Sequence, residues 1–252
     1  MYELVKDAAL YMNNIPGFIT LIAGHLAAML IFVLVVFPLH NYIKYMVIEK
    51  CGDKKRHPED YLTMKPSASF HWMGAISVFV LQMGFSFPIY QRRDRYYSPV
   101  LYTIYVALSG IGVYLGSFFA SLLLLSFVDA FDPQGIFNLE VLPVNAPVGH
   151  YIYYGITLML YVVMKISIYS AVINLIPLVP LDMGDVLYQF LPLQWSDFFR
   201  NNQMAVSAVI VAVLFLSIGQ PGGFVRDIST VISEPVINGF YFVAEKIASL
   251  FI

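Results

Sequence analysis

The sequence is poor in charged residues and nearly free of cysteine. Of its 252 residues, 59% are hydrophobic and 12% are charged, whereas soluble domains carry roughly 25% charged residues. A soluble fold of this length has too little interior for so much apolar surface, so the composition predicts an integral membrane protein. The net charge of -2 gives no basic field for nucleic acid, which we exclude as a partner. The single cysteine, Cys51, excludes an internal disulfide and a zinc site made of cysteines.

The N-terminus lacks the marks of a cleaved signal peptide. It begins Met-Tyr-Glu-Leu-Val-Lys-Asp, with no cationic region before the first apolar segment and no small-residue cleavage site. We therefore expect the first apolar segment to be retained as a membrane span. Before it, Leu4, Ala8 and Tyr11 share one helical face, which predicts an interfacial segment over residues 1–16.

Long apolar runs divide the chain into membrane helices, since ~20 apolar residues suffice for the ~30 Å of hydrocarbon. The expected spans are 18–39, 98–128, 150–176 and 203–219. The first helix is expected to continue to Lys50 and to stop at Cys51-Gly52. In the second run, Gly110, Gly112 and Gly116 are expected to allow close helix approach.

The loops give the orientation, because basic residues favour the cytoplasmic side. The loop Lys50–Lys65 and the run Arg92–Arg95 are basic, whereas Asp129–Gly149 has no Lys or Arg and is expected outside. Both ends of 72–90 then lie on one side, so this segment is a re-entrant hairpin or one basic loop breaks the rule. We expect an all-α polytopic membrane protein, a bundle of about 4–6 transmembrane helices in one domain (1–252) with a core over 18–219 and an amphipathic tail over 220–252.

The stretch from Asn174 to Gly184 ends a long apolar run with two prolines three residues apart. Proline does not fit a helix interior, so an irregular segment is expected at or near membrane depth, carrying Asp182. Two interpretations remain open. In the first, Asp182 is a carboxylate near membrane depth and marks a functional site. In the second, Asp182 caps a following helix over Gly184–Phe190.

The same stretch resembles the late motif Asn-x-x-Pro-x-x-Pro-Leu-Asp-Gly-Gly of the site-2 protease family of intramembrane zinc metalloproteases. Asn174, Pro177, Pro180 and Gly184 match it, and Met183 replaces the first Gly. Further pieces resemble family landmarks in the same order, over roughly residues 18–220. They are Gly52-Asp53, Lys65–Gly74, Phe87–Ile89 and Ala107–Gly110.

The catalytic motif of that family, His-Glu-x-x-His, is degenerate here. By spacing it becomes His40-Asn41-Tyr42-Ile43-Lys44. The resemblance implies two His and the Asp as zinc ligands and the Glu as the group that activates water. Lys44 has no lone pair for a metal, and Asn41 cannot take a proton from zinc-bound water. His40 and Asp182 supply two ligands, whereas catalytic zinc needs three protein ligands and an open position.

Two ideas address this loss. His71 is the best substitute third ligand, although an interfacial position beside Trp72 explains it better. Alternatively, the Lys44 ammonium stands where zinc would stand and pairs with Asp182. Lys165, in the middle of a predicted span, is the other candidate cation for that pair.

Three functions follow from these residues. The leading one is a catalytically degenerate site-2 protease homologue that binds a membrane-protein partner or peptide in the intramembrane cavity, with no cofactor. The second is an active intramembrane zinc metalloprotease with atypical ligands. The third is a transporter-like or proton-relay subunit built on Lys44, Lys165 and Asp182. In each case we expect an integral protein in contact with lipid, in the cytoplasmic membrane of a prokaryote.

Overall fold

The computed structural model describes residues 14–52, 64–85, 98–130, 146–178, 181–187 and 190–218, with 231, 234, 235 and 238 besides. Over these residues the chain forms helices and no strand. Three helices are long and apolar enough to cross a membrane, namely Ile15–Lys50, Pro99–Val128 and Val148–Asn174. The prediction of a helical membrane protein is therefore confirmed. Several predicted features lie outside the described residues. They are residues 1–13 of the interfacial segment 1–16, residues 53–63 of the loop Lys50–Lys65, the landmark Phe87–Ile89, the run Arg92–Arg95, residues 131–145 of the loop Asp129–Gly149, Pro180 and nearly all of the C-terminal tail.

The first membrane helix is continuous and changes its winding near the middle. It consists of α2 (Ile15–Ile31), a π-helical stretch η1 (Phe32–Val36) and α3 (Phe37–Lys50). Pro38 lacks a backbone donor and crowds the turn before it, and the wider winding of η1 just before it accommodates that defect. As expected, the helix ends at Lys50, and Gly52 follows with a φ of 120°.

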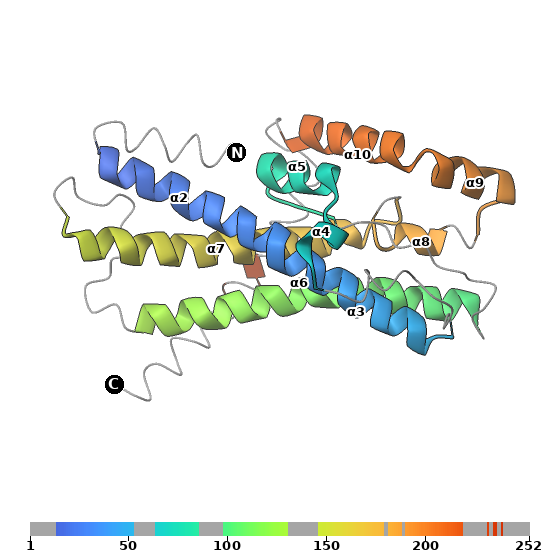
Figure 1. Ribbon diagram of the computed structural model, residues 1–252, viewed down its shortest axis with the longest axis horizontal. Coiled ribbons are helices and arrows are strands. Elements are labelled where there is room, and N and C mark those ends of the chain that lie inside the picture. The colour runs from blue at the N-terminus through green and yellow to red at the C-terminus, as the bar shows by residue number, and fades with distance from the viewer. Residues whose placement is uncertain are drawn as a thin grey trace.

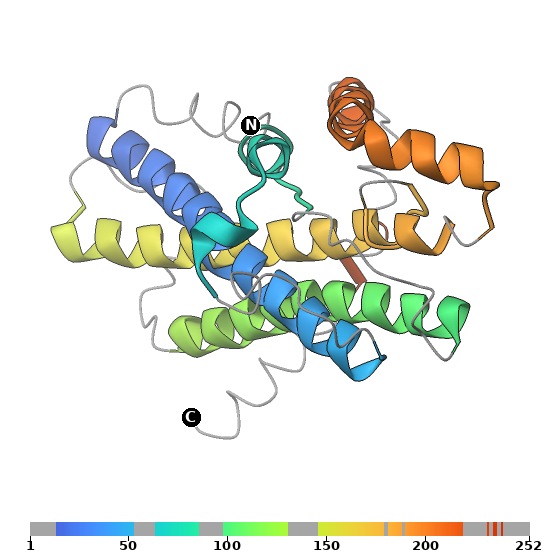
Figure 2. The same ribbon diagram turned by 45° about the vertical axis from the view of Figure 1, so that its right-hand side comes forward.

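The other two membrane helices pack against this one. Helices α6 (Pro99–Ala130) and α7 (Val148–Asn174) lie side by side, while α2 packs on α7 and α3 on α6 (Figures 1 and 2). The core between them includes an aromatic contact in which the rings of Phe32 and Tyr114 stack at 5.8 Å. Gly112 and Gly116 face open space, with nothing within 4 Å of an added Cβ, so the expectation that they allow close helix approach was wrong.

The segment 72–90 is only partly described, and its helix is short. Helix α4 (Pro66–Ser69) leads to α5 (Trp72–Leu81), which ends at Gln82 in the left-handed conformation, with a φ of 56°. Ten residues rise only ~15 Å, so α5 alone does not cross the ~30 Å hydrocarbon layer. Residues 83–85 follow without helical structure and are buried.

Between residues 181 and 218, the described part of the chain after α7 forms three further helices. The short α8 (Gly184–Leu187) follows the Pro-containing segment, and α9 (Leu193–Asn201) and α10 (Gln203–Ile218) come next. Helix α10 packs on α5 (Figure 1). At 16 residues it rises ~24 Å, slightly less than the hydrocarbon thickness.

Candidate functional site

Helix α3 carries the first part of the site on one face. His40 and Lys44 are one turn apart, and side chains at i and i+4 project in the same direction. Both are almost completely buried, with 1% of His40 and 2% of Lys44 exposed. A buried ammonium requires a partner, because the interior does not replace its hydration.

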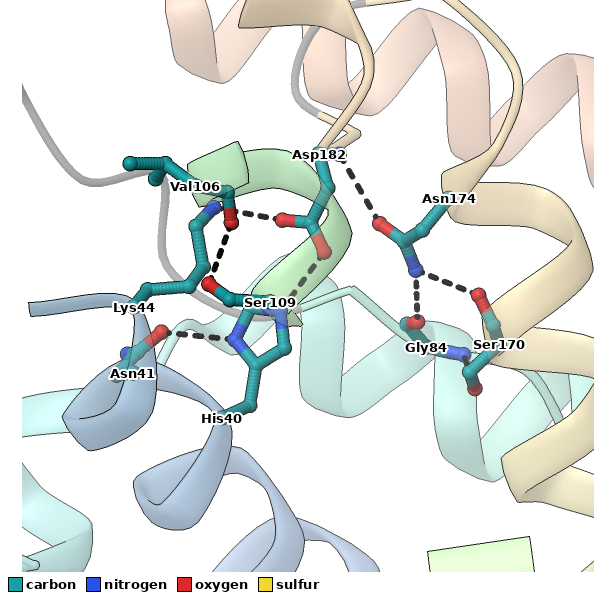
Figure 3. A network of polar contacts seen from close by, with 9 residues as sticks. All are labelled: His40, Asn41, Lys44, Gly84, Val106, Ser109, Ser170, Asn174 and Asp182. Atoms are coloured by element: carbon teal, nitrogen blue, oxygen red, sulfur yellow. Dashed lines mark hydrogen bonds and ion pairs between the residues drawn. The ribbon is translucent and has the colours of Figure 1, made fainter. Parts of the chain in front are cut away.

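That partner is Asp182, which the segment after α7 brings to the same place (Figure 3). The Lys44 ammonium donates to Oδ1 of Asp182 at 2.7 Å, and Nε2 of His40 lies 2.8 Å from Oδ2. Both carboxylate oxygens are therefore engaged by Lys44 and His40. One interpretation of the sequence had this side chain capping the following helix, and that interpretation was wrong.

Asn41 completes the polar contacts of the imidazole. Its Oδ1 lies 3.1 Å from Nδ1 of His40. An amide at this position serves either form of the ring, because it accepts from a protonated Nδ1 and, turned by 180°, donates to an unprotonated one. It orients His40 without supplying a base.

Gly110 on α6 leaves no spare room in this cluster. A Cβ added there would lie 2.5 Å from Oδ2 of Asp182 and 2.6 Å from Nε2 of His40. One turn further along α6, the ring of Tyr114 stacks on His40, with centroids 4.8 Å apart. Helix α6 thus closes the pocket of the ion pair, and neither Gly110 nor Tyr114 was among the site residues predicted from the sequence.

Asn174, the last residue of α7, fixes the segment that carries Asp182. Its Oδ1 accepts from the backbone N–H of Asp182 at 3.2 Å, and its backbone oxygen accepts from Met183 at 3.1 Å. Its Nδ2 donates to the carbonyls of Ser170, at 2.7 Å, and Gly84, at 3.2 Å (Figure 3). One amide therefore links α7, the residues after α5 and the Asp182 backbone.

Other residues of the motif shape the turn after α7. The N–H of Gly184 donates to the carbonyl of Leu181 at 2.9 Å, which closes the turn around Asp182. Pro177 lies inside a tight turn, in which the N–H of Leu178 donates to the carbonyl of Ile176 at 2.8 Å. The irregular segment expected from the two prolines is present from Leu175 to Leu178.

Asp182 lies beyond the three membrane helices, and its environment favours the ionised form. Burial by itself opposes ionisation, but the charges of His40 and Lys44 and their hydrogen bonds outweigh it and hold the pKa of the carboxyl below its ordinary value. The pair Lys44–Asp182 is therefore an ion pair.

Two other candidate residues lie elsewhere. The Lys165 ammonium sits over the ring of Tyr161, 4.9 Å from its centroid, so Lys165 is not the cation that faces Asp182. Lys165 lies nine residues before the end of α7, about 13 Å along the helix axis. His71 caps α5, where its Nδ1 accepts from the N–H of Gly74 at 3.2 Å.

The donor set does not fit the zinc that the family resemblance implies. Within the described part of the chain, no three His, Cys, Asp or Glu side chains gather as metal ligands. The two residues that could bind a metal, His40 and Asp182, are hydrogen-bonded to each other. The position one helical turn after His40 holds the Lys44 ammonium, which has no lone pair for a metal. A third ligand and a general base are both missing from this cluster.

The fold and the site together define a helical membrane protein with a buried Lys–Asp–His cluster where α3, α6 and the segment after α7 meet. Comparison with models of known families, with characterised proteins and with solved structures finds no match to this chain. The case for function therefore rests on the residues themselves.

Proposed function

We propose that this protein is a catalytically degenerate homologue of the site-2 proteases that works by binding a membrane-protein partner. The observation that carries the proposal is the Lys44 ammonium 2.7 Å from Asp182, at the position one turn after His40. The cluster keeps the carboxylate of the motif and neutralises it with a covalently attached cation. In this proposal the membrane is the cytoplasmic membrane of a prokaryote, α10 acts as a fourth membrane helix, and the region from α5 re-enters the bilayer.

The site of partner binding has to lie away from the cluster. His40, Lys44 and Asp182 are at most 5% exposed, and Gly110 leaves no space for even a Cβ beside them. An apolar groove of about 360 Å³ lies instead between α2 and α7, each of which belongs to a helix long enough to cross the membrane. Its lining includes Ala23, Ala27 and Gly155, and small residues of this kind allow a further helix to approach closely. In this proposal a transmembrane segment of the partner packs against this groove.

The loss of zinc chemistry is tested by metal analysis and a cleavage assay. Protein purified at neutral pH should contain substoichiometric zinc and should leave reconstituted membrane peptides intact. One zinc per chain together with cleavage would overturn the proposal and favour the atypical protease. That alternative needs a third donor, and His71, its best candidate, is engaged at the start of α5.

Partner binding is tested by photo-crosslinking in the native membrane. A photoreactive phenylalanine at Ala23, in the groove, should give a discrete crosslinked protein that disappears in an Ala27→Phe background, because the larger ring fills the groove. The matched control is the same probe at Leu123 of α6, which is 62% exposed. Equal products at both positions, or lipid adducts alone, would refute the docking of a partner in this groove.

The proton-relay alternative has one observation in its favour. His40, Asp182 and Lys44 form a continuous chain of buried titratable groups. A relay predicts proton flux in proteoliposomes that Lys44→Met abolishes. Lys165, stacked on Tyr161, is no member of that chain. Absence of flux in the wild-type protein would eliminate this function.

A further inference from the structure

Helix α9 carries an aromatic face that its polar residues do not interrupt. Its sequence is Leu-Gln-Trp-Ser-Asp-Phe-Phe-Arg-Asn, and it begins directly after Pro192. Trp195, Phe198 and Phe199 stand at positions i, i+3 and i+4, which lie on one side of a helix. The remaining positions of the helix are Leu193, Gln194, Ser196, Asp197, Arg200 and Asn201, five of them polar. The helix is amphipathic, with its apolar side made entirely of large rings.

Two of the three rings of this aromatic face are exposed, and the third, Phe199, is half-buried. Trp195 is 56% exposed and Phe198 is 53% exposed, and Phe190, just before the helix, is 70% exposed. The rings contact one another, with centroids 6.5 Å apart for Trp195–Phe198 and 5.7 Å for Phe198–Phe199. In water such a cluster would expose much apolar surface to solvent, since each ring is among the largest apolar groups in a protein.

The position of α9 gives the surroundings of this face. In both views, α9 lies at the end of the bundle where α3 ends and α6 begins (Figures 1 and 2). The first membrane helix ends there with a charged residue, Lys50, so the boundary between hydrocarbon and water falls near this level. Tryptophan and phenylalanine on a short amphipathic helix favour that boundary, where the rings meet acyl chains and the polar side meets headgroups.

We propose that the aromatic face of α9, formed by Trp195, Phe198 and Phe199, binds lipid at the boundary between headgroups and acyl chains. The contact anchors the chain a short distance after Asp182, because α8 and α9 follow that residue directly. Its ligand is the lipid surface itself.

Fluorescence quenching tests the depth of the face directly. The chain has two tryptophans, Trp72 and Trp195, so Trp72→Phe leaves Trp195 as the sole indole. This variant is reconstituted into phosphatidylcholine vesicles with lipids spin-labelled near the headgroup or near the chain terminus. Because an interfacial ring lies ~5–10 Å into the boundary, the shallow label should quench at least about twofold more than the deep label.

The remaining outcomes would overturn the proposal. Stronger quenching by the deep label would place Trp195 inside the hydrocarbon. Quenching by aqueous acrylamide alone would place it in water, and resistance to every quencher would mean that protein covers it. Trp195→Phe, with Trp72 as the sole indole, is the matched control for access of the labels. If the change at Trp72 prevents folding, the difference between wild type and Trp195→Phe reports the same ring.

Discussion

The Lys44–Asp182 pair allows a quantitative test, because both partners are buried and the carboxylate can be neutralised without a change in shape. Asp182→Asn preserves the volume of the side chain and removes its charge. It leaves the Lys44 ammonium, 2% exposed, facing a neutral amide. Breaking a buried pair in this way costs ~3–5 kcal/mol, since one charge remains buried without compensation.

The reverse change should cost less. In Lys44→Met, Asp182 keeps His40 at 2.8 Å as a second partner, so its charge retains a hydrogen-bonded neighbour. The double variant removes both charges and replaces the ammonium by an apolar chain of similar length. It should therefore recover part of the stability that Asp182→Asn loses, because no uncompensated ammonium is left.

The assay is a double-mutant cycle on the free energy of unfolding, measured by denaturant titration in detergent micelles. Coupling within one ion pair should exceed ~0.5 kcal/mol, whereas independent sites add within about that amount. Asp197→Asn, at an exposed carboxylate on α9, is the matched control and should change stability by less than ~0.5 kcal/mol. Additive losses for Lys44→Met and Asp182→Asn would refute the claim that these two charges hold the site together.

Three further predictions concern neighbouring features. Gly110→Ala should destabilise the protein in thermal unfolding because its Cβ meets Asp182 at 2.5 Å, whereas Gly112→Ala, with open space around it, should be neutral or stabilising, and equal effects would contradict the packing. Lys44→His combined with Asn41→Glu should gain bound zinc, because it adds a third donor beside His40 and Asp182; metal analysis showing no gain would mean that the side chains do not converge. Burial lowers the pKa of His71, so the unfolded chain binds a proton that the folded chain does not, and stability should fall as pH drops below about 6.5. His71→Asn, which can still accept from Gly74, should flatten that part of the unfolding profile, and an unchanged profile would assign the slope to another group.

Sequence periodicity and motif spacing predicted the three long helices and the residues that could meet. The apolar run before Pro177 predicted a membrane helix over 150–176, and α7 begins two residues earlier, at Val148, and ends two residues earlier, at Asn174. The pairing of Lys44 with Asp182 was one of two options for the cation, and the sequence held no distance that decided between Lys44 and Lys165. Lys44 reaches the carboxylate because α3 packs on α6 and because the turn after α7 carries Asp182 to the same place.

Other parts of the site were beyond the reach of sequence because their role depends on the helix face. Gly110, Gly112 and Gly116 look equivalent as small residues, yet Gly110 touches the ion pair and the other two face open space. The rotation of α6 about its axis decides this, and a helix with apolar residues on every side gives no polar face from which to read it. The stacking of Tyr114 on His40 follows from the same rotation.

The choice of cation determines what such a site can do. A buried carboxylate at this position needs a positive neighbour, and either a metal or an ammonium satisfies that need. A metal with three protein ligands keeps an open position for water or substrate, whereas the hydrogen bonds of Lys44 and His40 occupy both oxygens of Asp182 and Gly110 leaves no room for a further group. A lysine at position 44 therefore leaves no open position for such chemistry, and its ion pair with Asp182 joins α3 to the segment after α7. Asn174 holds the Asp182 backbone in place for this ion pair, so two separate contacts fix the segment after α7, one to α7 and one to α3.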